Sequence, residues 1–348
     1  MPKPELSGIS RASVQTHARS FGQRRTAPSG GLVKLFVTGA AGFIGCNFVH
    51  RLLAHTDDEI TVFDSLTYAG NLANLPMLES DHRLTFIRGD ITDRDVVRAA
   101  MSGHDALVHF AAESHVDRSI DGPDVFVRTN CDGTNVVCDV ARHLELDRVL
   151  HISTDEVYGS IDVGSFVESD RLEPRSPYSA SKAGSDMIAM SYFHTYGVPV
   201  MITRSSNNFG PYQFPEKVIP LFVTNLIRGL NVPLYGDGGN VRDWCHVDDN
   251  CAAVDLVLRQ GHSGEIYNIG AGNEITNLEL TQRILETFGV GDDRIDYVED
   301  RKGHDRRYSV NTDKVRSLGW RPARSFDEAL AETIDWYQAN ETWWRPLL

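Results

Sequence analysis

Short apolar segments alternate with longer segments of helical periodicity along most of the chain, from residue 32 onward. The apolar segments that we interpret as strands are residues 32–38, 59–63, 84–87, 106–110, 148–152 and 198–203. The segments in which apolar residues recur at helical spacing are residues 42–54, 124–144 and 179–196. Strands that alternate with helices form right-handed βαβ units on a parallel sheet. The pattern therefore predicts an α/β protein with a Rossmann-like, doubly wound parallel sheet.

After about residue 205 the apolar and helical segments are shorter, strands and helices no longer alternate regularly, and prolines interrupt the segments. This change predicts a second, smaller lobe of mixed α/β structure beside the first. We assign residues 31–205 and about 245–262 to the larger lobe. Residues 206–244 and 263–348 are assigned to the smaller lobe.

Composition and charge limit the possible functions. The chain has 348 residues, of which 41% are hydrophobic and 24% charged, as in ordinary globular proteins. Its net charge of −14 argues against nucleic acid as the main partner, because phosphate backbones bind to basic faces. No apolar run reaches the roughly 18 residues of a membrane-spanning helix, so we expect no membrane association. The five cysteines lack CxxC spacing, and we interpret them as a reduced, cytoplasmic set without a metal site.

Residues 1–30 differ from the rest of the chain. They contain five basic residues and one acid, and they have no apolar periodicity. The segment lacks the apolar stretch of a secretory signal and the clear amphipathic stripe of an organelle transit peptide. We interpret it as a disordered tail, or as the result of a misplaced start site, and assign no function to it.

A glycine-rich turn joins the first predicted strand to the first predicted helix. Gly39, Gly42 and Gly45 have GxxGxxG spacing, with Phe43 and Ile44 between the last two. Glycines let the backbone approach a diphosphate, and the helix N-terminus offers free N–H groups to it. The triplet alone is also compatible with an ordinary tight turn. Its position between a strand and a helix favours a dinucleotide site.

The ends of the next strands carry further candidate cofactor residues. Asp64 ends the second strand, 19 residues after Gly45. A carboxylate there accepts hydrogen bonds from ribose hydroxyls and repels a 2′-phosphate, which favours NAD over NADP. A solvated Asp at a strand end is the alternative. After the third strand Asp90 and Ile91 are candidates for holding the adenine, and small residues follow the fourth strand at Ala111 and Ala112.

Tyr178 and Lys182 are four residues apart and therefore lie on one face of a predicted helix. A neighbouring ammonium lowers the pKa of a phenol, so we expect Tyr178 to act as the base that takes a proton from a substrate hydroxyl during hydride transfer. A surface pair is the alternative, since YxxxK occurs often by chance.

Asp155 and Glu156 follow Thr154 at the end of the fifth predicted strand. Ligands bind at this edge of an open parallel sheet. Alcohol oxidation needs no second pair of carboxyls, so these two residues suggest a further proton transfer, with one protonating a leaving hydroxyl and the other taking a carbon-bound proton. The alternative is that one of them caps a helix.

Ten stretches of the sequence carry a family resemblance. They are VTGAAGFIG, DSLTYAGN, GDI, AAESHVDRS, ISTDEVYG, SPYSASKA, RSSNNFGPYQFPEKVIPL, GDGGNVRDW, GHDRRY and WWRPL, and together they run from about residue 33 to the C-terminus. On these motifs the chain resembles the extended short-chain dehydrogenase/reductases, and among them the dTDP-glucose 4,6-dehydratases. Epimerases and decarboxylases of the same fold usually lack the TDE triplet.

The resemblance implies an NAD⁺ that stays bound and is regenerated in each turnover. Tyr178, assisted by Thr154, would take the C4 hydroxyl proton as a hydride passes to NAD⁺, and Lys182 would bind the nicotinamide ribose. Glu156 would then take the C5 proton while Asp155 protonates the departing C6 hydroxyl. Return of the hydride to C6 would give a 4-keto-6-deoxy sugar nucleotide with no net redox change.

The resemblance also implies binding residues. Those expected to contact NAD, besides the glycine turn, are Phe43, Ile44, Asp64, Asp90, Ile91, Ala111, Ala112, Thr129, Tyr178, Lys182 and Asn208. Those expected to contact the sugar nucleotide are Ser114, Thr154, Asn207, Lys217, Arg242, Asn277 and the loop 300–305 with Asp300 and His304. The family implies a cytoplasmic homodimer whose helices in 124–144 and 179–196 form a bundle.

Several alternatives stay open. The same fold serves nucleotide-sugar epimerases, UDP-glucuronate decarboxylases and UDP-glucose 4,6-dehydratases, and a non-catalytic NAD-sensing or scaffold protein is the alternative from another class. The sequence does not distinguish thymidine from uridine. It departs from the family at Lys302, where Pro is common, and at Cys245, where a bulkier residue is usual and which we interpret as a buried rather than a reactive thiol.

Overall fold

The structure is a computed structural model that describes residues 33–348, so the predicted tail at 1–30 lies outside the described residues. Its centre is a seven-stranded sheet in which all neighbouring strands are parallel. The strands lie side by side in the order β10 (Ile266–Ile269), β6 (Val200–Ser205), β5 (Arg148–Thr154), β4 (Ala106–His109), β1 (Lys34–Thr38), β2 (Glu59–Asp64) and β3 (Leu84–Arg88).

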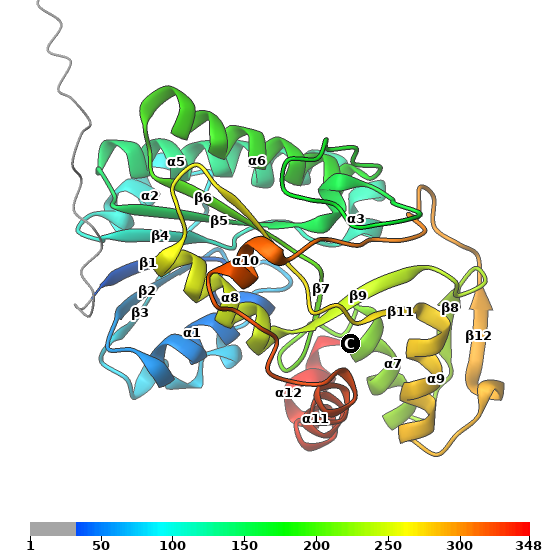
Figure 1. The fold of residues 1–348 in the computed structure, drawn as a ribbon. Coiled ribbons are helices and arrows are strands. Elements are labelled where there is room, and N and C mark those ends of the chain that lie inside the picture. Colours follow the sequence, from blue (N-terminus) through cyan, green and yellow to red (C-terminus); the bar gives the residue numbers. More distant parts are fainter. Residues whose placement is uncertain (1–32) are drawn as a thin grey trace, which may run out of the picture.

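Helices cover both faces of this sheet (Figure 1). Those on one face are α1 (Phe43–His55) and α8 (Val247–Gln260), and those on the other are α2 (Arg94–Met101), α5 (Thr134–His143) and α6 (Pro177–Tyr196). Alternation along β1 divides the core: Leu35 and Val37 pack with the first group, and Phe36 packs with the second. The predicted doubly wound, Rossmann-like fold is confirmed.

The predicted helix 124–144 is interrupted. The chain forms α4 (Pro123–Phe126), a π-helical segment η3 (Val127–Gly133) and then α5. Within the wider turn, Asn130 accepts a hydrogen bond from Glu113 N at 2.8 Å and donates one to Glu113 O at 3.0 Å. The irregularity thus joins this helical segment to the loop after β4, a long-range contact that helical periodicity does not reveal.

A smaller lobe contains two short sheets (Figure 1). One sheet has the order β11 (Glu274–Thr276), β9 (Val241–His246) and β7 (Asn207–Phe209), and the other pairs β12 (Ile295–Val298) with β8 (Val232–Tyr235). Its helices are α7 (Val218–Ile227), α9 (Asn277–Thr287), α11 (Phe326–Ala339) and α12 (Glu341–Trp344). Phe209, Phe222, Trp244 and Trp344 belong to its separate apolar core. The predicted mixed lobe is therefore present.

One predicted boundary is wrong. Residues from 263 onward were assigned to the smaller lobe, but Ile266–Ile269 forms β10 and pairs with β6 at the edge of the large sheet. Helix α10 (Asp313–Ser317), later in the chain, also lies close to β10, and Val315 and Trp320 pack into the core of the large sheet. Strand β10 has only four residues and lies about 60 residues after its partner β6 in the chain. So short a strand gives little hydrophobic periodicity in the sequence. The division into two binding domains stays a prediction.

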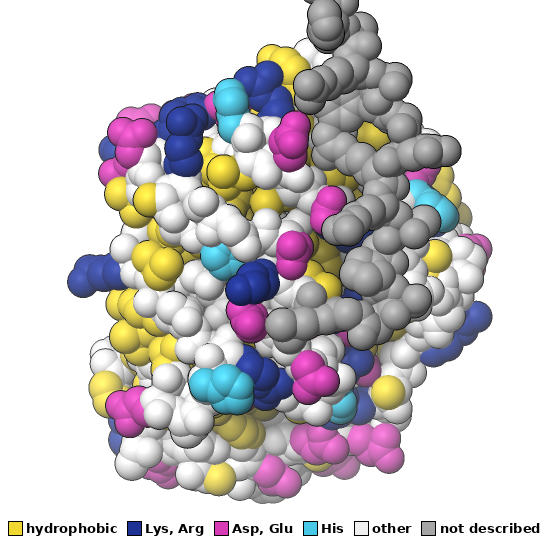
Figure 2. Space-filling model, turned by 90° about the vertical axis from the view of Figure 1, so that its left-hand side faces the viewer, with side chains coloured by type: hydrophobic (Ala, Val, Ile, Leu, Met, Phe, Trp, Pro, Cys, Tyr) yellow, Lys and Arg dark blue, Asp and Glu magenta, His cyan; other side chains and the backbone are white. Residues whose placement is uncertain are grey.

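The remaining helical segments are short. They are α3 (Val116–Asp121) and the 3₁₀ turns η1 (Leu72–Asn74), η2 (Pro76–Glu79), η4 (Asp155–Tyr158), η5 (Asp292–Arg294) and η6 (Arg345–Leu347). Across residues 33–348, no helix is both long and apolar enough to cross a bilayer. On the face shown in Figure 2, basic and acidic side chains are interspersed.

Candidate active site

The glycine turn after β1 is tightly packed. Gly39 has a φ of +70°, and a Cβ there would come within 2.5 Å of the Ala111 backbone nitrogen. A Cβ at Gly45 would come within 2.5 Å of the Gly39 carbonyl oxygen. Helix α1 begins at Phe43, where the first helical N–H groups have no carbonyl of their own helix to bond. This turn can accept a diphosphate against the backbone.

Asp64 fixes this turn to the neighbouring loop. Its two carboxylate oxygens accept hydrogen bonds from Ala41 N at 3.0 Å and Leu66 N at 2.8 Å. Burial raises the pKa of Asp64, and the two backbone bonds oppose that shift. Asp64 lines the groove as well, so it is placed to contact a ribose while it holds the turn in position.

A groove with a volume of about 1650 Å³ runs along this edge of the sheet. The predicted cofactor residues that line it are Gly39, Gly42, Phe43, Ile44, Gly45, Asp64, Asp90, Ile91, Ala111, Ala112, Thr129, Tyr178 and Lys182. The exception is Asn208, which lines the adjacent cavity. The tight glycine cradle and the strand-end carboxylate fit an NAD molecule in this groove.

The capping of α6 places Tyr178 and Lys182 in the site. Ser176 and Ser179 form a reciprocal capping box, and Pro177 occupies the first helical position. The Lys182 Nζ donates to the Ile152 carbonyl at 2.7 Å. Burial lowers the pKa of Lys182 to about 8, against the opposing charge of Asp186.

The pKa of Tyr178 is raised, not lowered as expected. Burial is the main cause, and the charge of Glu156 adds to it, while the Thr154 side chain opposes the shift. The expectation from sequence considered only Lys182, and it left out the cost of ionising a phenol in a buried position beside a carboxylate.

Two neighbouring carboxyls are shifted unequally at the end of β5. Burial and the charge of Glu156 raise the pKa of Asp155 well above its usual value. Burial also raises the pKa of Glu156, but Lys217 and Arg242 offset part of that shift. The N-cap of η4 is Thr154, whose Oγ1 accepts from Glu156 N at 3.2 Å. The capping alternative for the two carboxyls therefore does not apply.

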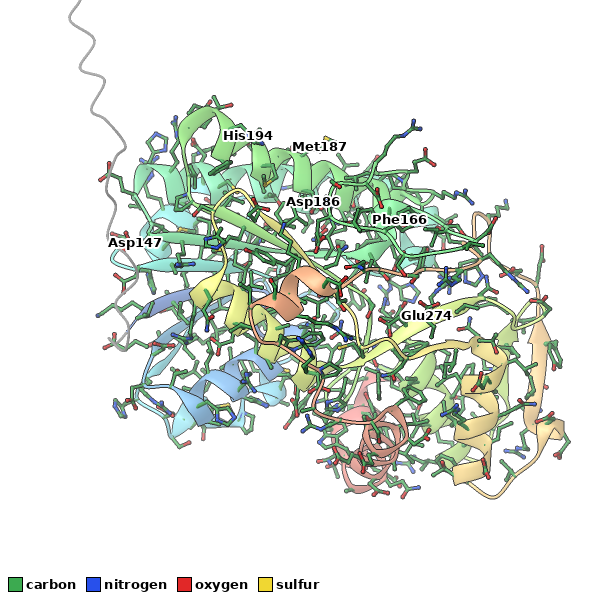
Figure 3. All side chains as sticks on the ribbon, in the orientation of Figure 1. Asp147, Phe166, Asp186, Met187, His194 and Glu274 are labelled. Carbon is green, nitrogen blue, oxygen red and sulfur yellow. The ribbon has the colours of Figure 1, made fainter. Side chains whose placement is uncertain are left out.

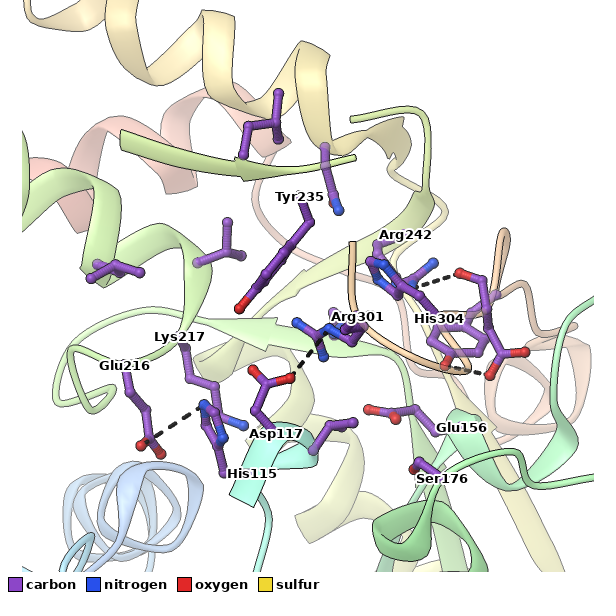
Figure 4. A pocket seen from close by; sticks show the side chains of 18 of the residues that line it. His115, Asp117, Glu156, Ser176, Glu216, Lys217, Tyr235, Arg242, Arg301 and His304 are labelled. Carbon is purple, nitrogen blue, oxygen red and sulfur yellow. Dashed lines mark hydrogen bonds and ion pairs between the residues drawn. The ribbon is translucent and has the colours of Figure 1, made fainter. Parts of the chain in front are cut away.

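A second cavity, of about 1190 Å³, adjoins the groove (Figure 4). It is lined by Glu156 and by five of the predicted substrate residues, Asn207, Lys217, Arg242, Asn277 and His304. Gln213, Glu216 and Lys217 line both spaces. The cavity brings a proton-transfer carboxyl and several cationic side chains together.

The cationic residues are held by backbone carbonyls and stacking. Arg242 donates to the Asp305 carbonyl at 2.9 Å and lies 4.1 Å from the centre of the Tyr308 ring. The Lys217 ammonium donates to the Ser114 carbonyl at 3.0 Å, and burial lowers its pKa. Such donors, fixed in position and able to bond anionic oxygens, suit a diphosphate.

Some predicted substrate residues do not line this cavity. Ser114 lines the cofactor groove instead, while Thr154 and Asp300 line neither space. Asp300 accepts a hydrogen bond from His304 Nδ1 at 2.6 Å, so it can orient the His304 side chain that lines the cavity. Asp155 also lines neither space, and in the described part of the chain its Oδ2 has no hydrogen-bond partner.

Arg301, in the predicted loop 300–305, lines the cavity and pairs with Asp117 at 3.6 Å. Sequence reasoning missed other residues of the cavity wall, among them Asp117 and the aromatic side chains of Tyr235 and Tyr308. Of the two departures from the family, Lys302 is exposed on its loop, and Cys245 is fully buried, with burial raising the pKa of its thiol, as interpreted from the sequence.

In residues 33–348 no group of three or more His, Cys, Asp or Glu side chains is arranged to hold a metal ion.

Comparisons with known proteins agree with this geometry. A family model described as GDP-mannose 4,6 dehydratase matches residues 36–333. A dTDP-glucose 4,6-dehydratase from Streptomyces antibioticus is 56% identical over 322 residues, covering 90% of this chain and 95% of that protein. Its counterpart from Mycobacterium tuberculosis is 46% identical over 321 residues, covering 90% and 96%.

Solved structures of a dehydratase and of an epimerase resemble this chain to different degrees. A dTDP-glucose 4,6-dehydratase from Streptomyces venezuelae, crystallised with NAD bound, has a TM-score of 0.89 and 55% identity, covering 90% of this chain and 100% of that one. A UDP-glucose 4-epimerase from Thermus thermophilus, in complex with NAD, has a TM-score of 0.82 and 30% identity, covering 88% and 99%. The chain therefore belongs to the dTDP-glucose 4,6-dehydratase family, within the extended short-chain dehydrogenase/reductases.

Proposed function

We propose that this protein converts dTDP-glucose to dTDP-4-keto-6-deoxyglucose, a dehydration used in deoxysugar biosynthesis. The observation that carries the proposal is the carboxyl pair, Asp155 and Glu156, at the end of β5, the strand whose Ile152 carbonyl accepts the Lys182 ammonium. A 4-epimerase needs hydride transfer and one base for the hydroxyl proton, whereas a dehydratase needs a further acid and base for the elimination. The identity to solved dehydratases, higher than to the epimerase, supports the same choice.

The groove beside the glycine turn is the proposed site of a tightly bound NAD. When bound, NAD⁺ supplies a hydride acceptor at the start of the turnover and a hydride donor at its end. Gly39, Gly42 and Gly45 would give the diphosphate access to the backbone, and Asp64 would bind the adenosine ribose. Lys182 would bond the nicotinamide ribose, and Asn208 would reach the cofactor from the adjacent cavity.

Oxidation at C4 is the first proposed step. Tyr178 accepts the proton of the C4 hydroxyl, and Thr154 hydrogen-bonds that hydroxyl. Because burial holds the phenol pKa high, the phenolate forms only with help from a nearby cation. Lys182, whose pKa is lowered to about 8, is the charged group one helical turn away and is proposed to supply that help.

Elimination across C5 and C6 follows. The 4-ketone acidifies the C5 proton, which Glu156 accepts as the C5–H bond breaks. Asp155, kept protonated by its raised pKa, gives its proton to the C6 hydroxyl, which leaves as water. Glu156 later returns a proton to C5 when C6 is reduced. The two carboxyls thus divide the work according to their different surroundings.

The diphosphate of the sugar nucleotide would lie among Arg242, Lys217 and His304 in the second cavity. We further propose that Asn207 and Asn277 contact the same substrate and that Ser114 acts from the groove side. The preference for thymidine over uridine is part of the proposal and depends on the cavity shape around the base.

The quaternary and cellular assignments are also proposals. We infer a homodimer through the outer surfaces of α4 and α6, where Val125 and Met187 are exposed. Figure 3 shows Met187 and His194 on the outer side of α6, while Asp186 points toward the sheet. Light scattering of the purified protein measures the assembly. A cytoplasmic location agrees with five cysteines that form no disulfide.

Incubation with dTDP-glucose labelled with deuterium at C4 tests the proposed activity. The expected product has lost water and carries the deuterium at C6, while turnover in heavy water places solvent deuterium at C5. A parallel incubation with UDP-glucose measures the base preference. Deuterium that stays at C4, as an epimerase would leave it, or product without loss of water would overturn the proposal.

A further inference from the structure

Three loops meet in front of the glycine turn. Strands β2 and β4 lie on either side of β1, so the loops that follow them leave the sheet on opposite sides of the turn that ends β1. Tyr68 follows β2, and Arg118 belongs to α3 after β4. The Arg118 guanidinium lies 3.7 Å from the centre of the Tyr68 ring. The contact between these two residues therefore joins the loops on either side of the glycine turn. Both loops line the groove, through Thr67 and Ala69 after β2 and through Ala112 and Glu113 after β4.

A carboxylate from a third loop ties the two together. Glu216, between β7 and α7, accepts hydrogen bonds from Tyr68 OH at 3.1 Å and from Arg118 Nε at 3.2 Å. His115 Nε2 lies 3.8 Å from the same carboxylate. The Glu216 side chain is only 17% exposed, so these bonds are shielded from water more than ordinary surface ion pairs are.

Glu216 also separates the two spaces of the site. Its side chain lines both the cofactor groove and the substrate cavity, as does Lys217, whereas Tyr68 and Arg118 line neither. Figure 4 shows Glu216 paired with His115 beside Lys217 at one side of the cavity. Tyr68 and Arg118 therefore hold Glu216 from outside, and their bonds neutralise a carboxylate that would otherwise repel a neighbouring diphosphate.

Backbone strain is concentrated in the same loops. Among the described residues, three that are not glycine have a positive φ, and two of them are Leu66, at 55°, and Tyr212, at 67°. Leu66 precedes Tyr68 by two residues, and Tyr212 precedes Glu216 by four. Strained backbone of this kind persists where the surroundings hold it in place, and it is frequent at sites that clamp ligands.

We propose that Tyr68, Arg118 and Glu216 form a clamp that closes over the middle of the cofactor groove and sets the rate at which NAD leaves. The inference rests on the proposed function, because a cofactor that is reduced and reoxidised on the same sugar must not escape in between. The three residues are positioning residues, since their bonds act on the cofactor through the loops. Glu216 is 98 residues from Arg118 and 148 residues from Tyr68 in the sequence, so the clamp forms only when the chain folds.

Release of labelled NAD from the holoenzyme tests the clamp. Protein carrying radiolabelled NAD is chased with excess unlabelled NAD, and the label that remains is measured after rapid gel filtration. Glu216→Gln keeps the side-chain shape but loses the charge, and Tyr68→Phe keeps the ring but loses one hydrogen bond. We expect both variants to release label about tenfold faster than the parent, a change of about 1.4 kcal/mol in the barrier.

Matched controls distinguish the clamp from a general loss of stability. Glu341→Gln breaks an exposed pair with Arg345, neither of which lines the groove or the cavity, and it should leave the release rate unchanged. The double variant Arg118→Gln/Glu216→Gln should release label only slightly faster than Glu216→Gln alone, because the contact it additionally removes is the stacking of Arg118 on Tyr68. Arg118→Lys keeps the positive charge, so it should release label more slowly than Arg118→Gln.

The outcomes separate the clamp from the proposed activity. Unchanged release in Glu216→Gln and Tyr68→Phe, with melting temperatures equal to that of the parent, overturns the clamp and leaves the dehydratase proposal standing. A parent protein that retains NAD, with faster release in the variants but no turnover of dTDP-glucose, overturns the activity and supports the clamp. Rapid loss of label from the parent overturns the clamp as well as the tight binding of NAD.

Discussion

The cofactor groove and the substrate cavity share a wall, but backbone atoms line much of the groove whereas side chains line the cavity. Backbone makes much of the groove: Gly39 and Gly45 exclude side chains, and the groove follows successive strand ends. Long side chains make the cavity, among them Lys217, Arg242 and His304 from three distant segments. A backbone surface tolerates no added atom, whereas a side-chain surface can lose one member and keep the rest. The two regions should therefore respond to substitution in different ways.

A single added side chain in the glycine turn should have the largest effect. Gly45→Val places a Cβ 2.5 Å from the Gly39 carbonyl, where only backbone could give way. We expect purified protein without NAD and an activity reduced by at least about 10⁴-fold, beyond the usual loss of one acid or base. The nucleotide content of denatured protein and the rate of product formation measure both effects.

Gly289→Ala is the control for this change, because Gly289 also has a positive φ but a Cβ there meets nothing within 4 Å. It should cost some stability and leave the NAD content unchanged. If Gly45→Val still carries a full complement of NAD, the groove is not the backbone cradle described here.

Loss of the base should have the next largest effect, and it should act on chemistry instead of binding. Glu156→Gln should slow the overall reaction by about 10²–10⁴-fold. Because Glu156 takes no part in C4 oxidation, the absorbance of reduced cofactor should accumulate during a single turnover. Full turnover with no such accumulation would contradict the assignment of Glu156.

Asp155→Asn is the matched variant for the acid. It should also slow elimination, with the C5 proton still exchanging into heavy water because Glu156 is intact. A loss of C5 exchange in Asp155→Asn but not in Glu156→Gln would reverse the two roles.

A change in the cavity wall should be smaller and confined to the substrate. Arg242→Gln removes a guanidinium held by the Asp305 carbonyl and the Tyr308 ring. We expect KM to rise by about 10- to 100-fold, the range for losing hydrogen bonds to a charged group, with an unchanged NAD content. Arg306→Gln, which removes an exposed pair with Asp237, is the control and should leave KM unchanged. Loss of NAD from Arg242→Gln would contradict the separation of the two spaces.

The same difference explains how much the sequence could predict. The groove follows from local rules: a strand, a glycine turn and a helix, then Asp64 at the next strand end, and every member lies within a short motif. The pairing of Tyr68 with Glu216 spans 148 residues and depends on how two loops meet in space. No periodicity or motif spacing carries that information, so the clamp could not be predicted.

The errors have physical causes of the same kind. The strand β10 was missed because four residues give little periodicity and its partner β6 lies far earlier in the chain. The upward shift of the Tyr178 pKa was missed because burial is a property of the folded protein. The resemblance assigns Asn208 to NAD and Ser114 to the sugar nucleotide, and each lines the space across the shared wall from that ligand, so both roles stay predictions.

The smallest expected effect is one of stability, and it comes from the acid. The pKa of Asp155 is raised by burial and by the charge of Glu156, so folding keeps this carboxyl protonated. The unfolded chain ionises it above about pH 4, the usual value for Asp. Stability from the neutral carboxyl is therefore complete below about pH 4 and is lost as the pH rises through the raised pKa. Asn cannot ionise, so Asp155→Asn should be more stable than the parent at pH 7, by roughly 1.4 kcal/mol for each pH unit between about 4 and either the raised pKa or pH 7, whichever is lower.

Asp186 provides the opposite case in the same core. Burial alone would raise the pKa of Asp186, but hydrogen bonds and charge from His151 and Arg204 outweigh it and lower that pKa. Asp186→Asn should therefore be less stable than the parent at pH 7, and its deficit should shrink only as the pH falls below about 4, the usual pKa of Asp. Urea unfolding of the parent and both variants between pH 2 and pH 8 measures the two slopes. An Asp155→Asn curve parallel to that of the parent above pH 4 would show that Asp155 is ionised in the folded protein, and a carboxylate there could not protonate the departing hydroxyl. Curves that diverge in opposite directions would mean that the protein gives up stability at Asp155 to keep a proton available for catalysis.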